Sequence, residues 1–201
     1  MRDNQNNNIL SQKPCVHVYI RKMPFDVASK DIFPVERLVE IDDAGNGKVR
    51  TQKYYAWKLL ELAMSEVFGL DMSDSGISKA DGIWCCNSCK FSISHSGEYL
   101  AVAISTHPVG IDIEEADMER FDAIRHKILH PKEESLCRDL CILWTCKESI
   151  FKKLNKKIFV PRKINTLEHN CYSRKLMFDD KNFVVSVATD LDEEIQFNIK
   201  V

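Results

Sequence analysis

Two acidic side chains stand two positions apart in an alternating segment of the sequence. Residues 109–114 read Val-Gly-Ile-Asp-Ile-Glu and contain Asp112 and Glu114. In a β-strand these carboxylates would point to one face, about 6.6 Å apart along the strand, while Ile111 and Ile113 would enter a core. Because like charges repel, a hard divalent cation such as Mg²⁺ could lie between them. A solvated acidic surface is the alternative, since more acids follow, at Glu115, Asp117 and Glu119.

A third carboxylate candidate is Glu148, in the segment Trp-Thr-Cys-Lys-Glu-Ser of residues 144–149. Lys152 follows four residues later, which places both side chains on one face of a predicted helix. An ordinary surface ion pair would have the same spacing. However, residues 147–163 contain seven Lys or Arg and a single acid, Glu148 itself. A carboxylate set among cations suits a substrate that carries phosphate groups.

The segment Ser94-His95-Ser96-Gly97 lies where a predicted strand ends and the chain turns. A histidine there can donate to a phosphate oxygen, together with backbone N–H groups of the turn. An exposed histidine beside a serine-capped turn is the alternative. Lys58, preceded by Lys48 and Arg50, adds positive charge that could equally belong to a solvated helix face.

Hydrophobic periodicity predicts the elements that must position these residues. Alternating segments predict strands, with hairpins at 91–105 and 183–199; the strands are 16–20, 91–94, 100–105, 109–114, 183–188 and 195–199, with 175–178 as a possible further strand. Helical spacing predicts a helix from Thr51 to Phe68, ended by Gly69, and another from Pro131 to about Leu154, with a possible break. The order strand, long helix, hairpin thus occurs twice. The sequence therefore predicts an α+β fold of two half-domains, residues 1–106 and 107–201, with the site in the cleft between them.

The composition limits the class of protein. The chain has 201 residues, of which 44% are hydrophobic, and 28 Lys+Arg against 30 Asp+Glu give a net charge of −2. A globally basic nucleic-acid binder is disfavoured, and the basic stretch 147–163 has few aromatic residues, Phe151 and Phe159. We expect no membrane span and, from the polar start of the chain, no secretion or transit signal. These features predict a cytoplasmic protein.

Eight cysteines leave one alternative open. We expect reduced, buried thiols in a cytoplasmic protein. Cys86 and Cys89 nevertheless have C-x2-C spacing, and Cys137 with Cys141 could complete a zinc site, although C-x3-C within a helix matches a zinc ribbon poorly. A zinc-stabilised interaction protein is therefore one rival hypothesis.

Taken together, three segments resemble the signature motifs of the Sfp-type 4′-phosphopantetheinyl transferases. They are Phe-Ser-Ile-Ser-His-Ser-Gly at 91–97, Val-Gly-Ile-Asp-Ile-Glu at 109–114 and Trp-Thr-Cys-Lys-Glu-Ser-Ile-Phe-Lys at 144–152. The resemblance extends from about Lys48 to Arg162. It implies a pseudo-twofold pair of α+β halves and a monomeric holo-[acyl-carrier-protein] synthase. Such an enzyme moves the phosphopantetheine arm of coenzyme A to a serine of an apo acyl or peptidyl carrier protein and releases adenosine 3′,5′-bisphosphate.

The resemblance also implies roles for particular residues. Asp112, Glu114 and Glu148 would hold Mg²⁺ against the coenzyme A pyrophosphate. Glu148 would act as the base toward the incoming serine, directly or through a water, and Lys152 would neutralise charge at the transferred group. The residues implied to bind coenzyme A are Ser94, His95, Lys58, Arg50 and Lys147.

One departure and one rival remain. Many relatives carry Gly-Lys-Pro before the Ser-His motif, where this chain has Gly82-Ile83-Trp84, so the lysine is missing unless Lys79 or Lys90 replaces it.

A basic patch is a candidate for docking the acidic carrier, and it comprises Arg120, Arg125, His126 and Lys127, with Phe121 and Ile124 nearby. A non-catalytic module that binds coenzyme A or a carrier protein is the second rival hypothesis.

Overall fold

A computed structural model describes residues 15–26, 33–135, 139–190 and 194–200. Its strands and helices come in separate runs along the chain, so the α+β class predicted from the sequence is confirmed. The strands are β1 (Cys15–Lys22), β2 (Ser78–Ala80), β3 (Ile83–Cys85), β4 (Lys90–Ser96), β5 (Tyr99–Ser105), β6 (Val109–Glu115), β7 (Asn170–Phe178), β8 (Lys181–Thr189) and β9 (Glu194–Lys200). The α-helices are α1 (Val35–Asp42), α2 (Gly47–Phe68), α3 (Met118–Ala123), α4 (Arg125–Ile128) and α5 (Leu140–Lys153). Short 3-10 turns are η1 (Met72–Asp74), η2 (Pro131–Glu133), η3 (Pro161–Lys163) and η4 (Thr166–Glu168).

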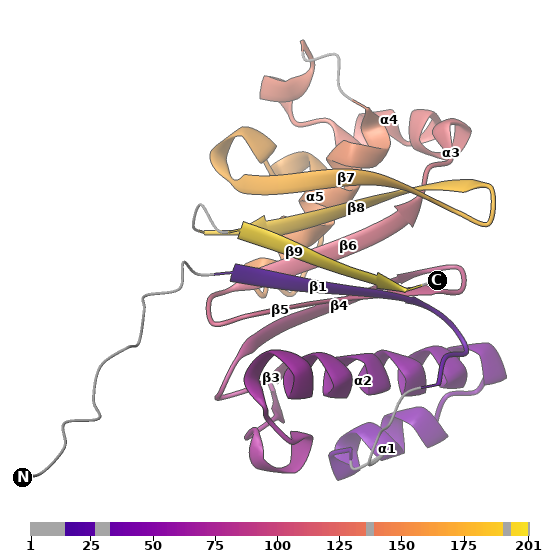
Figure 1. Ribbon diagram of the computed structural model, residues 1–201. Coiled ribbons are helices and arrows are strands. Elements are labelled where there is room, and N and C mark those ends of the chain that lie inside the picture. Colours follow the sequence, from indigo (N-terminus) through magenta and orange to yellow (C-terminus); the bar gives the residue numbers. More distant parts are fainter. Residues whose placement is uncertain (1–14, 27–32, 136–138, 191–193, 201) are drawn as a thin grey trace, which may run out of the picture.

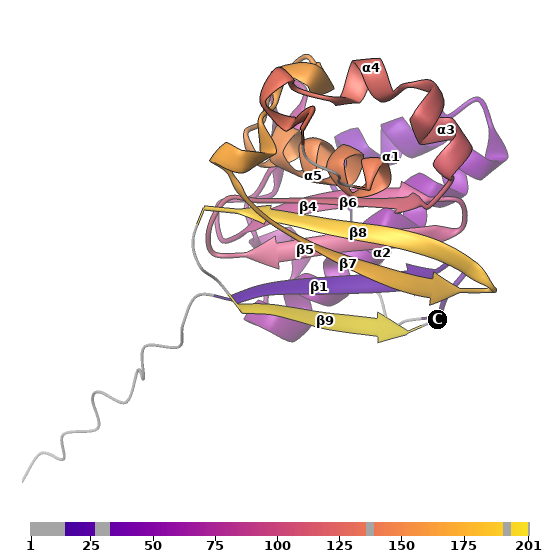
Figure 2. The same cartoon turned by 90° about the horizontal axis from the view of Figure 1, so that it is seen from above.

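Two sheets lie between two helical layers (Figure 1). The first sheet has the strand order β4-β5-β1-β9 and the second has the order β6-β8-β7. Helices α1 and α2 cover the outer side of the first sheet, while α5, α3 and α4 cover the second. The view from above shows the strands of both sheets running in similar directions (Figure 2).

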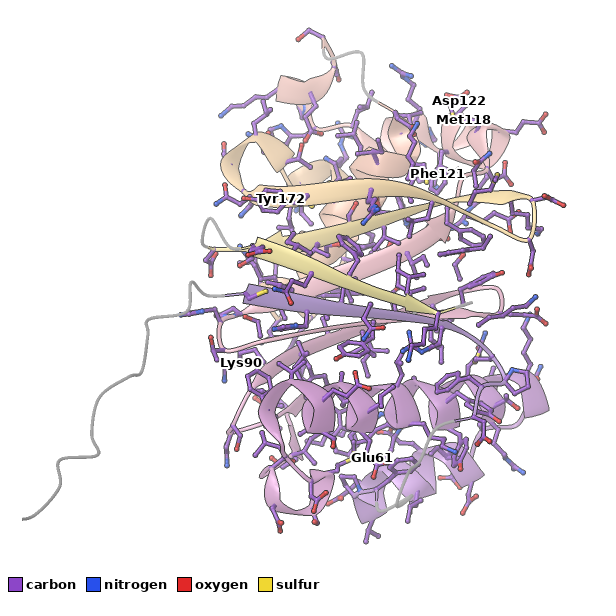
Figure 3. All side chains as sticks on the ribbon, viewed as in Figure 1. Glu61, Lys90, Met118, Phe121, Asp122 and Tyr172 are labelled. Atoms are coloured by element: carbon purple, nitrogen blue, oxygen red, sulfur yellow. The ribbon has the colours of Figure 1, made fainter. Side chains whose placement is uncertain are left out.

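The burial pattern of β5 explains why the sheets stack. All seven of its residues are buried. Leu100 and Val102 pack toward α2, while Ala101 and Ala103 pack against the second sheet. Such a continuous apolar strand needs cover on both faces. Side chains fill the space between α2 and the first sheet (Figure 3).

The long helices differ from prediction at their starts. Helix α2 begins at Gly47 rather than Thr51, because the Asn46 side chain caps it by accepting from the Lys48 N–H. It ends at the predicted Gly69, whose φ of 63° is a conformation that glycine adopts without strain. The second predicted helix is divided: Pro131 opens only the turn η2, and α5 starts after Asp139, which caps it.

The predicted hairpin between residues 183–188 and 195–199 is wrong. Strand β8 pairs with β6 and β7, whereas β9 pairs in parallel with β1 of the first sheet. The tight turn before β8 contains Asp179 and Asp180, both with positive φ, and therefore joins β8 to β7. The predicted strand 175–178 is the end of β7, and the hairpin at 91–105 is confirmed as β4 and β5. Along the described part of the chain, no helix is both long and apolar enough to cross a bilayer.

Candidate active site

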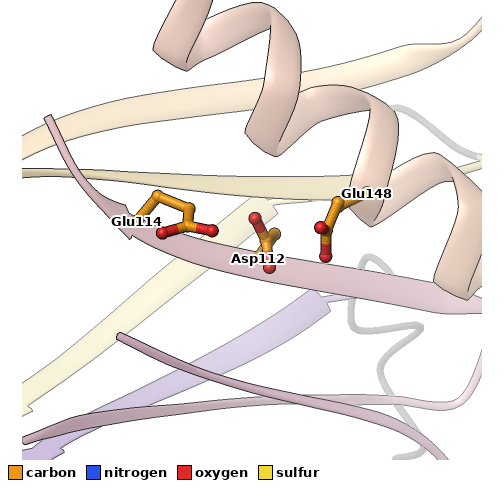
Figure 4. Close-up of side chains that lie close together, drawn as sticks. All are labelled: Asp112, Glu114 and Glu148. Atoms are coloured by element: carbon orange, nitrogen blue, oxygen red, sulfur yellow. The ribbon is translucent and has the colours of Figure 1, made fainter. Parts of the chain in front are cut away.

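Asp112, Glu114 and Glu148 form a carboxylate cluster (Figure 4). Asp112 and Glu114 come from β6 and Glu148 from α5, and one oxygen of each lies within 4.8 Å of the others. Asp112 is buried, and the other two are half-buried. Within the described residues, no other group of three or more His, Cys, Asp or Glu side chains gathers so closely. The i, i+2 reasoning on β6 thus identified two members correctly.

Close packing of α5 on the second sheet brings Glu148 to this strand. A Cβ at Gly110 would lie 1.9 Å from the Ser149 carbonyl oxygen, so only glycine permits this approach of helix to strand. Ser149 Oγ donates to the Ser186 carbonyl at 2.8 Å, and the Thr145 and Ser186 hydroxyls are 2.6 Å apart. These contacts set the position of α5 at Thr145, about one turn before Glu148, and at Ser149, directly after it.

The Asp112 carboxylate is held on one oxygen and open on the other. Its Oδ1 accepts hydrogen bonds from Ser94 Oγ at 2.7 Å and from Lys152 Nζ at 2.8 Å. Its Oδ2 is buried and has no hydrogen-bond partner among the described residues. A buried carboxylate oxygen without a partner is costly unless a cation or water meets it. The donor set, three carboxylates with one free buried oxygen, therefore fits a hard divalent cation.

The other two carboxylates of the cluster, Glu148 and Glu114, have different charged neighbours. Desolvation and then the charge of Asp112 raise the pKa of Glu148 to about 7, although Lys152 opposes this shift. Lys152 Nζ lies 3.5 Å from the Glu148 carboxylate. On the other side, Arg120 donates to both carboxylate oxygens of Glu114, at 3.1 and 3.3 Å. Glu148 is thus the group in the cluster that can bind and release a proton near neutral pH.

A cleft of about 470 Å³ opens beside the cluster. His95 and Lys152 line the end near the carboxylates. All of its charged lining residues are basic, several others are aromatic, and no described lining residue is acidic. The basic and aromatic lining residues are Arg37, Lys53, Lys152, Lys156, Trp57, Trp84, Phe91 and Phe151. Such a surface suits an anionic ligand that carries an aromatic ring.

His95 occupies the place predicted for a ligand contact. It is exposed, near the end of β4, and lines the cleft. Desolvation, followed by the positive charge of Lys152, lowers the pKa of His95, although Glu114 and Asp112 oppose this. A neutral imidazole can still donate one N–H to a phosphate oxygen.

Three other residues predicted to bind coenzyme A do not line the cleft. The structure corrects the assignment of Lys147, whose side chain is fully buried. Its Nζ donates to Glu133 at 2.6 Å and to the Pro161 and Ile164 carbonyls, so all three N–H groups are used inside the fold. Arg50 and Lys58 do not line the cleft. Arg50 donates to the Asp42 carbonyl, and Lys58 lies over the rings of Tyr54 and Tyr55.

The cleft also contains residues that sequence reasoning missed. Arg37 is buried, and its Nε has no hydrogen-bond partner among the described residues. Lys53 lies on the same face of α2 as Ala56, which also lines the cleft. Helical spacing from Ala56 could have favoured Lys53 over Lys58, whereas nothing in the sequence placed α1 and Arg37 here. Trp84, in the segment that lacks the Gly-Lys-Pro lysine, also lines the wall.

Among the residues that the structure describes, the cysteines of the rival zinc hypothesis do not gather into one site. The Sγ atoms of Cys86 and Cys89 are 3.4 Å apart in the core beneath α2. Cys141 belongs to a separate core between α5 and the second sheet. Cys137 lies outside the described residues.

Comparisons with known proteins agree with this geometry. Residues 108–192 match the model of the 4′-phosphopantetheinyl transferase superfamily. The chain is 38% identical over 79 residues to the 4′-phosphopantetheinyl transferase gsp of Aneurinibacillus migulanus, an alignment covering 35% of this chain and 33% of that protein. The chain thus spans about a third of the length of this relative. The residues matched by the superfamily model contain the whole carboxylate cluster and Lys152.

Proposed function

We propose that this protein transfers the 4′-phosphopantetheine arm of coenzyme A to a serine of an apo acyl or peptidyl carrier protein. The reaction depends on Mg²⁺ and releases adenosine 3′,5′-bisphosphate. The single observation that carries the proposal is the carboxylate cluster with Lys152 bound to it, beside a basic and aromatic cleft. The match of residues 108–192 to the model of the 4′-phosphopantetheinyl transferase superfamily supports the same reaction.

In this proposal Asp112, Glu114 and Glu148 hold the Mg²⁺ ion. When bound, the ion supplies charge neutralisation at the pyrophosphate. Asp112 offers the buried Oδ2 that lacks a partner in the protein, and Arg120 keeps the Glu114 carboxylate oriented. The protein's part is to present three preorganised anionic groups on two rigid elements, β6 and α5.

Glu148 and Lys152 carry the chemistry of the transfer. The serine hydroxyl oxygen attacks the phosphorus that bears the pantetheine arm. The bond between this phosphorus and the leaving oxygen of adenosine 3′,5′-bisphosphate breaks. Glu148 takes the serine proton, directly or through a water. Lys152 donates to Asp112 and reaches the end of the cleft, where it stabilises charge on the transferred and leaving groups.

The cleft would bind the nucleotide part of coenzyme A. His95 and Lys152 lie near the carboxylates, and Arg37 and Lys53 provide further positive charge along the wall. Trp84 presents a half-buried ring that is fixed edge-on against Trp57, with centroids 4.7 Å apart. We propose that this ring contacts the adenine base, in place of the contact that the missing lysine makes in relatives.

The carrier protein would dock near α3 and α4. Helix α4 exposes Arg125, His126 and Lys127, which suit an acidic partner, while α3 also exposes the acids Glu119 and Asp122. Arg120 is exposed but pairs with Glu114, and Phe121 is buried in the core, so Phe121 supports this surface rather than forms it. We also propose a monomer, because both sides of the site come from one chain, and a cytoplasmic location. The division into half-domains 1–106 and 107–201 related by a pseudo-twofold stays a prediction.

The product analysis that tests this proposal uses chromatography of the small molecules. The protein is incubated with coenzyme A, Mg²⁺ and an apo acyl or apo peptidyl carrier. We expect coenzyme A to be consumed and adenosine 3′,5′-bisphosphate to appear in equal amounts, only when a carrier is present. Binding of coenzyme A without consumption on either class of carrier would favour the alternative, a non-catalytic coenzyme A or carrier-protein binding module.

A further inference from the structure

Three serines of β4 form a seam between the two sheets. Ser92, Ser94 and Ser96 alternate along the strand and are all buried. Their hydroxyl oxygens accept from the backbone N–H groups of Ile111, Ile113 and Glu115, at 3.1, 3.4 and 3.0 Å. We call Ser92, Ser94 and Ser96 the serine seam.

The serine seam replaces a backbone ladder. Strand β4 is an edge strand of the first sheet and β6 is an edge strand of the second. The two strands do not pair through their backbones. The alternate N–H groups of β6 that face β4 would therefore be buried without acceptors, which is costly. Serines at every second position of β4 supply these acceptors. The seam thereby aligns the strand of His95 with the strand of Asp112 and Glu114.

Ser94 differs from its two neighbours in the seam. Its hydroxyl accepts from Ile113 N and also donates to Asp112 Oδ1, at 2.7 Å. Lys152 donates to the same oxygen. With two donors on Oδ1, the carboxylate is held so that Oδ2 is the oxygen left free. A hydrogen bond to a charged acceptor is stronger than a neutral one.

We propose that Ser94 is a positioning residue that orients Asp112 toward the cation, rather than a ligand of coenzyme A. Ser94 is buried behind Asp112 and does not line the cleft, whereas His95 does. This inference rests on the proposed function, because it assigns Ser94 a part in preparing the same metal site.

The test measures Mn²⁺ binding by isothermal titration calorimetry in the absence of coenzyme A. The variants are Ser94→Ala and Ser96→Ala. The second is a matched control, because it removes one hydrogen bond of the seam without touching Asp112. We expect Ser94→Ala to weaken Mn²⁺ binding about tenfold or more, and Ser96→Ala to stay within about threefold of the wild type. In steady-state kinetics Ser94→Ala should lower kcat and leave KM for coenzyme A unchanged.

Other outcomes would overturn the inference. Equal Mn²⁺ affinity in Ser94→Ala and Ser96→Ala would reduce Ser94 to a structural member of the seam. A raised KM for coenzyme A at unchanged Mn²⁺ affinity would make it a coenzyme A ligand. If Ser94→Ala does not fold, Ser94→Cys keeps the size with a weaker donor, and wild-type Mn²⁺ affinity in that variant would also overturn the inference. Each of these three results could occur with full transferase turnover, so each would leave the proposed function intact.

Discussion

Asp112 is the residue on which most contacts of the site converge. It receives Ser94 and Lys152 on one oxygen and keeps the other free, and Glu148 lies beside it. Because Lys152 binds Asp112 rather than an outside partner, its charge is fixed at the end of the cleft near the carboxylates before any substrate arrives. Preorganised charge of this kind needs little rearrangement as the reaction proceeds.

Replacing Lys152 should therefore affect turnover more than binding. We expect Lys152→Ala to lower kcat by about 100-fold or more and to change KM for coenzyme A by only a few fold, since Lys152 acts where charge develops. Steady-state kinetics with a saturating apo carrier protein measure both constants. A matched control is Lys156→Ala, which removes an exposed lysine of the same cleft that has no contact with the carboxylates. An effect of Lys152→Ala confined to KM would contradict this role.

Single residues were predictable where a local pattern determined their position. The alternation around Asp112 and Glu114 placed both carboxylates on one strand face, and the i,i+4 spacing placed Glu148 beside Lys152, while only the family resemblance joined the two sets into the cluster that the structure contains. Lys147 shows the limit of this reasoning. Its place in a basic stretch indicated a surface ligand, but its burial depends on Glu133 and on carbonyls far along the chain.

At the scale of elements, the approach of α5 to β6 creates the site. Gly110 lies where the Ser149 carbonyl of α5 comes closest to the strand. We expect Gly110→Ala to destabilise the fold by about 1–3 kcal/mol, because the added methyl group must displace the helix backbone. Transfer activity should fall as well, since Glu148 and Lys152 move with the helix.

Chemical denaturation and the transfer assay measure both effects of Gly110→Ala. Gly47→Ala is the control, because no atom lies within 4 Å of the added Cβ, and we expect it to be neutral or slightly stabilising. Wild-type stability and activity in Gly110→Ala would contradict the close packing of α5 on β6.

Strand β3 supplies the ring that we place against the adenine. Trp84→Ala should raise KM for coenzyme A about tenfold with little change in kcat, because loss of base–aromatic stacking weakens binding without touching the reacting groups. Trp84→Phe should retain most of the affinity. Adenosine 3′,5′-bisphosphate should bind more weakly to Trp84→Ala, whereas 4′-phosphopantetheine should bind equally to both proteins. Equal binding of the nucleotide to both proteins would refute the contact.

Helices and strands were predictable where nearby residues cap them or set their periodicity. The pairing of strands that lie far apart in the sequence was not predictable. The end of α2 at Gly69 and the hairpin of β4 and β5 follow from neighbouring residues. The apolar alternation of β9 indicated a strand correctly, but it carries no information about its partner, which is β1 at the opposite end of the chain.

At the scale of the whole molecule, a buried ion pair joins the segments around α5. Glu133 and Lys147 are both fully buried. Glu133 also accepts from the Thr166 N–H and hydroxyl, at 2.8 and 2.7 Å. Lys147 connects the same point to the carbonyls of Pro161 and Ile164. The pair thus ties η2, η3 and η4 to the helix that carries Glu148.

Breaking this pair should cost stability. We expect Glu133→Gln to lower the free energy of unfolding by about 3–5 kcal/mol, because it leaves the Lys147 charge buried without a counterion. Urea denaturation gives the value. The control is Glu168→Gln, which breaks an exposed pair with Lys132 and should have a much smaller effect. Equal effects of the two substitutions would contradict the structural role of the buried pair.

The same pair predicts the acid limit of the fold. Burial alone would raise the pKa of Glu133, but hydrogen bonds from Lys147, Thr166 and His130 outweigh burial and hold this pKa below its ordinary value of 4.5. The stabilising contribution is therefore present above pH 4.5 and is lost as the pH falls through the lowered pKa. Glu133→Gln should remove part of the acid sensitivity in this range.

The central claim is that the carboxylate cluster holds a divalent cation on which transfer to a carrier serine depends. Intact-protein mass spectrometry of an apo carrier incubated with this protein, coenzyme A and Mg²⁺ tests it most directly. We predict a mass gain of one phosphopantetheine arm, which is lost in EDTA, restored by excess Mg²⁺ and absent with Glu148→Gln. A mass gain that persists in EDTA, or wild-type rates with Glu148→Gln, would contradict the claim.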